Sequence, residues 1–185
     1  MIRTLPLALR NRLAATILDA VGDGQARRML AVVAESPATW LAPDETQWAP
    51  LLAARARRAS EALASLAPST SRGLDDVLEI AARLYEAGLY FEVHEWLEPH
   101  WMTASGEPRD ALQGLIQAAV GWQHLANDNV AGARSLLTEA AARLHGRRLG
   151  GRDFDAFARA TADAAASVPT AVPPPFPQPP LAMRA

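Results

Sequence analysis

Apolar residues recur along almost the whole chain at intervals of three and four positions. This spacing places side chains on one face of an α-helix, and no stretch shows the strict alternation of a half-buried strand. The sequence therefore predicts an all-α fold. Its helices are expected near residues 9–21, 26–33, 48–66, 77–85, 90–101, 108–125 and 130–146, with a last one around Phe154 and Phe157.

Glycine, proline and short polar runs separate these periodic segments, as turns require. The breaks are expected at Gly22 and Gly24, Ser36-Pro37, 67–73, Ala87-Gly88, 102–107, 127–129 and Gly150-Gly151. We expect an N-terminal helical segment over 1–67, a core of helical hairpins over 74–150, and a C-terminal helix with a tail over 151–185. A chain of this length buries about 70% of its unfolded surface, so one compact domain without a stabilising metal is expected.

A shift of 40 residues superimposes two of the predicted helix pairs, laying Gly88 on Asp128, Val93 on Ala133, Trp96 on Leu136 and Leu97 on Leu137. Each unit is a helix, a tight polar turn and a second helix. Such repetition predicts stacked antiparallel αα-hairpins of the tetratricopeptide kind.

The segment PTAVPPPFPQPPL, residues 169–181, cannot form a helix and predicts an extended arm. We expect this proline-rich arm to lie on its own domain or on a neighbour, anchored by Phe176. The alternative is a ligand for an aromatic groove elsewhere.

The amino-acid composition excludes several classes of catalytic and binding chemistry. The 185 residues contain no cysteine, and all 18 basic residues are arginine. Disulfides, thiol catalysis, Schiff-base lysines and P-loops are thereby excluded. The 20 acidic residues leave a net charge of −2, so no basic field recruits nucleic acid. We interpret the cluster of Arg55, Arg57 and Arg58 as a solvated helix face.

The chain has no uncharged run long enough to cross a membrane, so we expect no membrane partner. Arg10, Asn11 and Arg12 interrupt the apolar stretch near the first residue, which leaves no secretory signal. A cytoplasmic location is the resulting expectation.

Polar residues interrupt the apolar faces of two helices. Tyr90, His94, Leu97 and Trp101 form one stripe, with Glu98 a turn beyond His94. A second stripe contains Gln113, Gln117, Val120 and His124. Gly114 and Gly121 each weaken the helix by about 1 kcal/mol relative to alanine, which predicts close approach of a neighbouring helix or a ligand.

If the two helices form a hairpin centred on residue 105, Glu98 lies near residue 112 and His94 near residue 116. Gln113 and Gln117 are then within reach of Glu98 and His94 respectively. His124 is displaced from His94 by about 12 Å along the axis, too far to share a metal. One interpretation is a buried polar network in which Gln113, Gln117 and His124 take part with His94 and Glu98. In that case removal of His94 strands its partners, and His94→Ala and Gln117→Ala destabilise the protein non-additively.

The other interpretation is a metal site. His94 and Glu98 share a helix face as ligand pairs do, and Glu95 or Glu92 could act as general base. Glutamine is a poor zinc ligand, so Gln113 and Gln117 add little to such a site. Trp96, Trp101 and Trp122 are interpreted as core residues.

Three motifs in order carry a resemblance to a known family: YFEVHEWLEPHW, then G-x-P-R-x-x-L-Q-G-L-I-Q-A-A-V, then N-x-x-G-A-R-x-L-L. Together they resemble the domain of unknown function 309 family over residues 77–145. The resemblance implies a small all-α protein and a metal-dependent hydrolase. The family's His-Glu and Glu positions correspond to His94, Glu95 and Glu98, and its glutamines to Gln113 and Gln117.

Three functional hypotheses follow. The first is a hydrolase that uses a divalent metal, with His94 and Glu98 as ligands and Glu95 as base. The second is a non-catalytic helical-hairpin module that binds a small molecule or a peptide, or serves as a scaffold. The third is self-association, since the tryptophans and the tail offer apolar surface for a homodimer.

Overall fold

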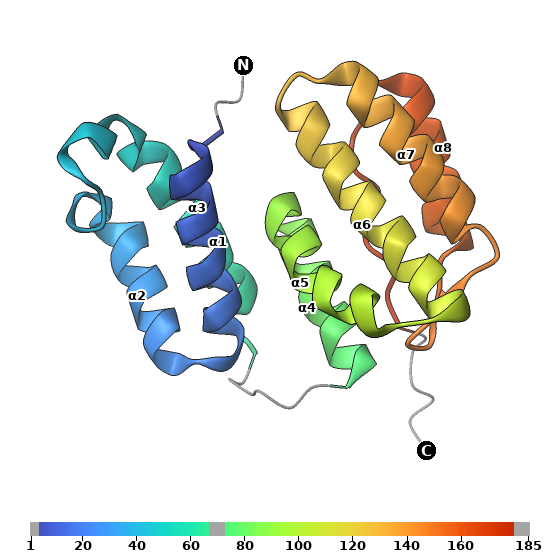
Figure 1. Cartoon of the computed structure of the whole chain (residues 1–185), viewed down its shortest axis with the longest axis horizontal. Coiled ribbons are helices and arrows are strands. Elements are labelled where there is room, and N and C mark those ends of the chain that lie inside the picture. The colour runs from blue at the N-terminus through green and yellow to red at the C-terminus, as the bar shows by residue number, and fades with distance from the viewer. Residues whose placement is uncertain (1–3, 67–72, 180–185) are drawn as a thin grey trace.

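The computed structural model describes residues 4–66 and 73–179, and in these ranges the chain folds as an all-α helical bundle (Figure 1). The helices are α1 (Leu7–Gly22), α2 (Gly24–Glu35), α3 (Ala49–Leu63), α4 (Leu74–Glu86), α5 (Tyr90–Thr103), α6 (Gly106–Ala126), α7 (Val130–Leu144) and α8 (Asp155–Ser167). Two short 3₁₀ helices, η1 (Pro37–Thr39) and η2 (Pro43–Trp48), connect α2 to α3. The predicted all-α helical bundle is confirmed.

Consecutive helices pack against each other in two groups. Helices α1, α2 and α3 form one group, and α6, α7 and α8 form the other, with α4 and α5 between them (Figure 1). Helix α5 contacts both α1 and α6, and α3 contacts α4, so α4 and α5 connect the two groups. In the part of the chain that the structure describes, no helix is both long and apolar enough to cross a bilayer.

The structure adds three local features that the hydrophobic pattern does not predict. A small antiparallel hairpin, β1 (Arg148–Leu149) and β2 (Arg152–Asp153), turns through Gly150 and Gly151, both with positive φ. Helix α6 begins at Gly106, ahead of Pro108, and α5 continues through Pro99 to Thr103. The turn between these two helices is therefore shorter than the sequence predicts.

Residues 168–179 follow α8 without helix or strand, and Phe176 in this segment lies against α4 and α8. The ring of Phe176 is only 2% exposed and contacts the rings of Tyr85, Phe154 and Phe157. The backbone N–H of Phe176 donates to a carboxylate oxygen of Glu86, 2.7 Å away. This segment therefore completes the aromatic core between α4 and α8.

A buried ion pair joins α3, in the first group, to α5. Nη2 of Arg55 lies 2.9 and 3.0 Å from the two carboxylate oxygens of Glu92, and Glu92 is completely buried. The interpretation of Arg55 as part of a solvated face is therefore wrong, although Arg57 and Arg58 are exposed. Arg55 points inward because a buried carboxylate requires a positive partner.

The two glycines of α6 lie where α7 crosses closely, which confirms the predicted approach of a neighbouring helix. A Cβ atom at Gly114 would lie 2.7 Å from Cγ of Leu144, and one at Gly121 would lie 2.9 Å from Cγ of Leu137. Both leucines are completely buried. Trp122 is buried as expected, whereas Trp96 and Trp101 are only partly so.

The buried ion pair generates the first prediction. Glu92→Gln leaves the Arg55 guanidinium without a counter-charge, which costs about 3–5 kcal/mol in the free energy of unfolding. The double variant Arg55→Met/Glu92→Leu removes both charges, so it should lose less of the free energy of unfolding than Glu92→Gln. Urea unfolding of the full chain measures both. The control is Glu107→Gln, which breaks an exposed pair with Arg147 and changes stability little. Equal effects of Glu92→Gln and Glu107→Gln would contradict the importance of the buried pair.

The second prediction concerns the close crossing of α6 and α7. Gly114→Ala gains about 1 kcal/mol of helix propensity but forces its methyl group against Leu144, and overpacking costs about 1–3 kcal/mol. We expect net destabilisation in thermal or urea unfolding. Gly24→Ala is the matched control, because its nearest neighbour would be 3.7 Å away and it should be neutral or stabilising. Two variants of equal stability would argue against a tight crossing.

Candidate functional site

Three polar side chains gather on the outer side of α5. Nδ1 of His94 lies 3.4 Å from a carboxylate oxygen of Glu95, and Nε2 lies 3.9 Å from one of Glu98. One ligand atom from each of the three residues falls within 4.8 Å of the others. In residues 4–66 and 73–179 no other group of three His, Cys, Asp or Glu side chains is arranged this way.

The rotation of α5 is fixed by the apolar residues on its opposite face. Val93 and Leu97 are completely buried in the core, and Glu92 is held by Arg55. Positions 94, 95 and 98 therefore turn outward, since i, i+1 and i+4 lie within about 100° of one another on a helix. Their side chains are 28%, 37% and 45% exposed, so the cluster is open to solvent on one side.

His94 also lines a small pocket between α1, α5 and α6. The pocket has a volume of about 230 Å³. Its lining combines three aromatic or apolar residues with five polar ones: Tyr90, Phe91, Val120, Arg10, His94, Gln123, His124 and Asn127. None of these is a carboxylate. The cluster of His94, Glu95 and Glu98 thus adjoins a cavity of small-molecule size.

The hydrogen bonds of Asn129 determine the tautomer of His124. Oδ1 of Asn129 accepts from the backbone N–H of Gly132 at 3.0 Å, so its Nδ2 must be the atom 2.7 Å from Nδ1 of His124. Nδ1 therefore accepts, and the imidazole proton lies on Nε2. A histidine that lines the pocket is in this way kept as a hydrogen-bond donor.

Tyr90 lines the same pocket as His94 and His124. Burial, with the nearby carboxylate of Glu86 as a smaller cause, raises the pKa of the Tyr90 hydroxyl to about 12. The hydroxyl therefore keeps its proton throughout the physiological range. Tyr90 also lines the neighbouring cavities, so it separates this pocket from the space between α3 and α4.

The structure does not bring the glutamines to His94 and Glu98 as the hairpin geometry predicts. Nε2 of Gln117 donates instead to Glu139 on α7, at 2.8 Å. In the described part of the chain no hydrogen bond joins Gln113 to Glu98. The spacing explains the difference, because Gly114, Gln117 and Gly121 share the face of α6 that packs on α7. His124, in turn, bonds to Asn129 rather than to a glutamine.

Glu92 cannot serve as the general base that the sequence allows. Its carboxylate is completely buried and both oxygens accept from Arg55. Glu95 lies beside His94 and is open to solvent.

Sequence reasoning missed the contribution of α1 to the pocket. Arg10 reaches α5 and stacks on Phe91, with its guanidinium carbon 4.0 Å from the ring centroid. The apolar stripe of α1 shows which face is buried but not which later helix it meets. The aromatic at position 91 is the only local signal, since arginine often stacks on exposed aromatic rings.

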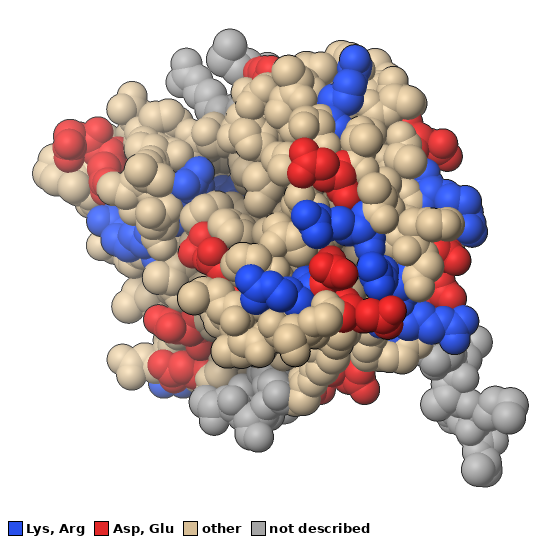
Figure 2. Space-filling view, turned by 45° about the vertical axis from the view of Figure 1, so that its right-hand side comes forward, with Lys and Arg blue, Asp and Glu red and all other residues tan. Residues whose placement is uncertain are grey.

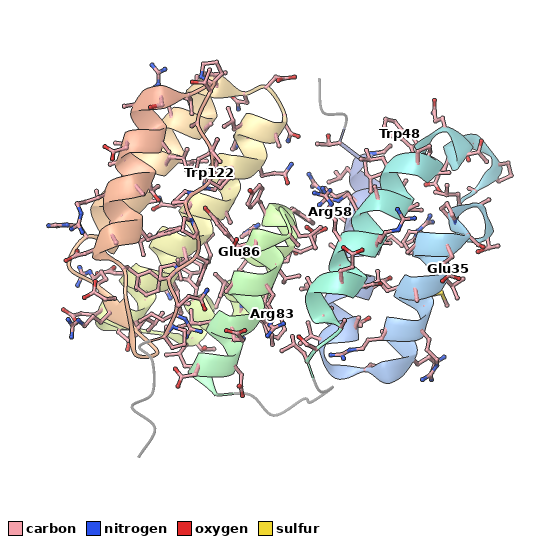
Figure 3. All side chains as sticks on the ribbon, turned by 180° about the vertical axis from the view of Figure 1, so that it is seen from behind. Glu35, Trp48, Arg58, Arg83, Glu86 and Trp122 are labelled. Atoms are coloured by element: carbon pink, nitrogen blue, oxygen red, sulfur yellow. The ribbon has the colours of Figure 1, made fainter. Side chains whose placement is uncertain are left out.

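A larger and more open cavity, of about 650 Å³, lies between α3 and α4. Figure 3 labels three residues of its lining, Arg58 on α3 with Arg83 and Glu86 on α4. Burial, and secondly the nearby Arg55, lower the pKa of Arg58. Arg83 is paired with Glu79, and Glu86 binds the backbone of Phe176, so most of these charges already have partners.

Acidic and basic side chains are interleaved on the face formed by α6 and α7 (Figure 2). Arg147 lies 3.2 Å from Glu107 and 3.3 Å from Asp110, and Asp110 also pairs with Arg143 at 4.0 Å. These contacts hold α6 to the end of α7. The charged residues on this face form neither a uniformly positive nor a uniformly negative surface.

The site thus belongs to an all-α protein with a histidine–carboxylate cluster beside a small pocket. Residues 78–136, from α4 into α7, match the family described as Domain of unknown function (DUF309). The resemblance is confirmed over the segment that carries His94, Glu95, Glu98, Gln113, Gln117 and His124. No curated protein and no solved structure matches the chain.

The separate partners of His94 and Gln117 generate the third prediction. His94→Ala removes a partly exposed side chain paired only within its own helix, so we expect less than about 1 kcal/mol of destabilisation. Gln117→Ala should add to it within about 0.5 kcal/mol, because the two residues share no partner. Thermal melts of both single variants and the double variant, in metal-free buffer, test this. Strong non-additivity would instead support the shared polar network.

Proposed function

We propose that this protein is a metal-dependent hydrolase acting on a small molecule. A divalent ion would be held by His94 and Glu98, and Glu95 would act as general base. The observation that carries the proposal is the convergence of one imidazole and two carboxylates, within 4.8 Å, beside the pocket. These residues lie in the segment that matches the domain of unknown function 309 family, whose resemblance, from the sequence motifs, implies a metal-dependent hydrolase.

The donor set fits a transition-metal ion. Zinc accepts both imidazole nitrogen and carboxylate oxygen, manganese is suited by the carboxylate oxygens, and magnesium prefers oxygen alone. One open side of the cluster is needed for water and substrate, and the partial exposure of all three side chains provides it. When bound, the ion would lower the pKa of a coordinated water and polarise the substrate.

The remaining steps, orientation of the imidazole and proton transfer, would be performed by residues of the chain. Glu95 faces Nδ1 of His94, so its carboxylate can accept the Nδ1 proton and leave Nε2 free to bind, as in carboxylate–histidine–metal arrangements. Its second oxygen can take a proton from the attacking water as the water oxygen bonds to the substrate. That proton then passes to the leaving group when the scissile bond breaks.

The fourth prediction is that the purified, untagged full chain binds one Mn²⁺ or Zn²⁺ per molecule after chelation and dialysis. Titration with Mn²⁺, followed by the paramagnetic resonance of the free ion, gives the dissociation constant. Mn²⁺ at 100 times this constant should raise the melting temperature by about 5–10 °C. His94→Ala and Glu98→Gln should each weaken binding by at least about tenfold.

The matched control is His145→Ala. His145 also has a carboxylate neighbour, Asp155, at 3.4 Å, but lies just beyond the end of α7. Its removal should leave Mn²⁺ affinity unchanged. A wild-type chain without stoichiometric metal, or equal losses in His94→Ala and His145→Ala, would overturn the proposal. The non-catalytic binding module would then be the better account of the pocket.

With metal bound, the variant Glu95→Gln distinguishes a loss of metal affinity from a loss of hydrolytic activity. If Glu95 is the base, Glu95→Gln retains most of the Mn²⁺ affinity but loses the hydrolysis of 4-nitrophenyl acetate or 4-nitrophenyl phosphate that wild type shows. Full activity of Glu95→Gln would exclude Glu95 as base.

A further inference from the structure

Arg10 is a positive charge without a negative partner beside the candidate site. Its guanidinium stacks on Phe91, and its Nε is buried without a hydrogen-bond partner. Nη2 makes one long contact with Oδ1 of Asn11, at 3.5 Å. Among the described residues, no carboxylate lies within ion-pair distance of Arg10, whereas Arg12, two positions further on, pairs with Glu45 at 2.9 Å.

The rest of the pocket lining also favours a negative ligand. Arg10 is its only formally charged residue, apart from the titratable His94 and His124. His124 presents Nε2–H as a donor, because Asn129 occupies Nδ1. The amides of Gln123 and Asn127 supply further polar atoms, and Tyr90, Phe91 and Val120 complete the lining.

We propose that this pocket binds the oxyanion group, a carboxylate or a phosphate, of a small molecule, with Arg10 as its anchor. The planar guanidinium can donate two parallel hydrogen bonds to such a group, and stacking on Phe91 holds the plane in place. A volume of about 230 Å³ admits a compact metabolite rather than a polymer. The inference rests on the proposed hydrolase and names its substrate class: the anionic end lies at Arg10 and the reacting end at His94.

The anchor comes from outside the family-matched segment. Arg10 lies on α1, whereas the match covers residues 78–136. The metal cluster and the charge that selects the ligand are therefore supplied by different parts of the chain. Arg10 is a specificity-determining residue, not a catalytic one.

The fifth prediction is tested by nuclear magnetic resonance on ¹⁵N-labelled full chain, in chelated buffer at constant ionic strength. Inorganic phosphate and acetate are titrated separately, and the side-chain signals of Arg10 Nε–H and His124 Nε2–H are followed. Both signals should shift with one saturable dissociation constant. Arg10→Gln should weaken the binding by at least about tenfold, the loss expected for a charged hydrogen bond. Binding of phosphate alone or acetate alone identifies the preferred group.

Arg12→Gln is the matched control. It makes the same charge change on the same helix and removes the same kind of stacking, since Arg12 lies 4.2 Å from the ring centroid of Trp40. We expect its anion affinity to stay within about twofold of wild type. Equal weakening by both variants, or no saturable shift at tens of mM anion, would overturn the inference.

These titrations contain no metal. Their outcome can therefore contradict the anion site without contradicting the proposed hydrolase, and the reverse. Mn²⁺ binding with no anion effect at Arg10 would leave the hydrolase standing and remove the substrate class. Anion binding that depends on Arg10, without any Mn²⁺ site, would support the pocket as an oxyanion site and remove the hydrolase.

Discussion

The buried ion pair between Arg55 and Glu92 is the constraint on which the rest of the structure depends. It joins α3 to α5 over 37 residues of sequence, and it is almost fully removed from water. A buried carboxylate without a partner is too costly to persist, so the first three helices must dock where Arg55 can reach Glu92. That docking brings α1 against α5, and with it Arg10 over Phe91. The pocket beside His94, between α1, α5 and α6, therefore depends on the docking of the first three helices on α5.

Helix α6 has a different role on each of two faces. On the face toward α7, two glycines admit Leu137 and Leu144, and Gln117 reaches Glu139. On the face toward α5, Val120 and His124 contribute to the pocket. The close packing with α7 also sets the position of Asn129 at the start of that helix. Through Asn129 the same packing fixes the proton of His124, so the core and the pocket are linked by one hydrogen-bonded amide.

The sequence predicts the fold because helical periodicity and turn residues are local signals. The positions of all eight helices in the described ranges follow from them, and Gly114 and Gly121 correctly indicate a close crossing. The partners of polar side chains do not follow. Hairpin geometry places Gln117 within reach of His94 along the axis, but it does not say that Gln117 faces α7 instead of α5. The pairing of Arg55 with Glu92 is a long-range choice that no local pattern encodes.

For the candidate site the same distinction holds. His94, Glu95 and Glu98 lie on one helix, so their proximity follows from the sequence and the structure brings them together. Arg10, 84 positions before His94, could enter the site only through the packing of α1 on α5. Glu92 is a plausible base from its charge, which the sequence shows, but its burial appears only in the structure.

Arg10 lies outside the family-matched segment, and this position has a consequence for ligand selection. The proposed metal cluster and the proposed ligand-selecting charge lie on separate stretches of chain that meet where α1 contacts α5. A substitution on α1 can therefore change which molecules enter without altering the groups that act on them. Under these two proposals, ligand preference is set by Arg10 on α1, outside the matched segment, and the hydrolytic chemistry by residues inside it.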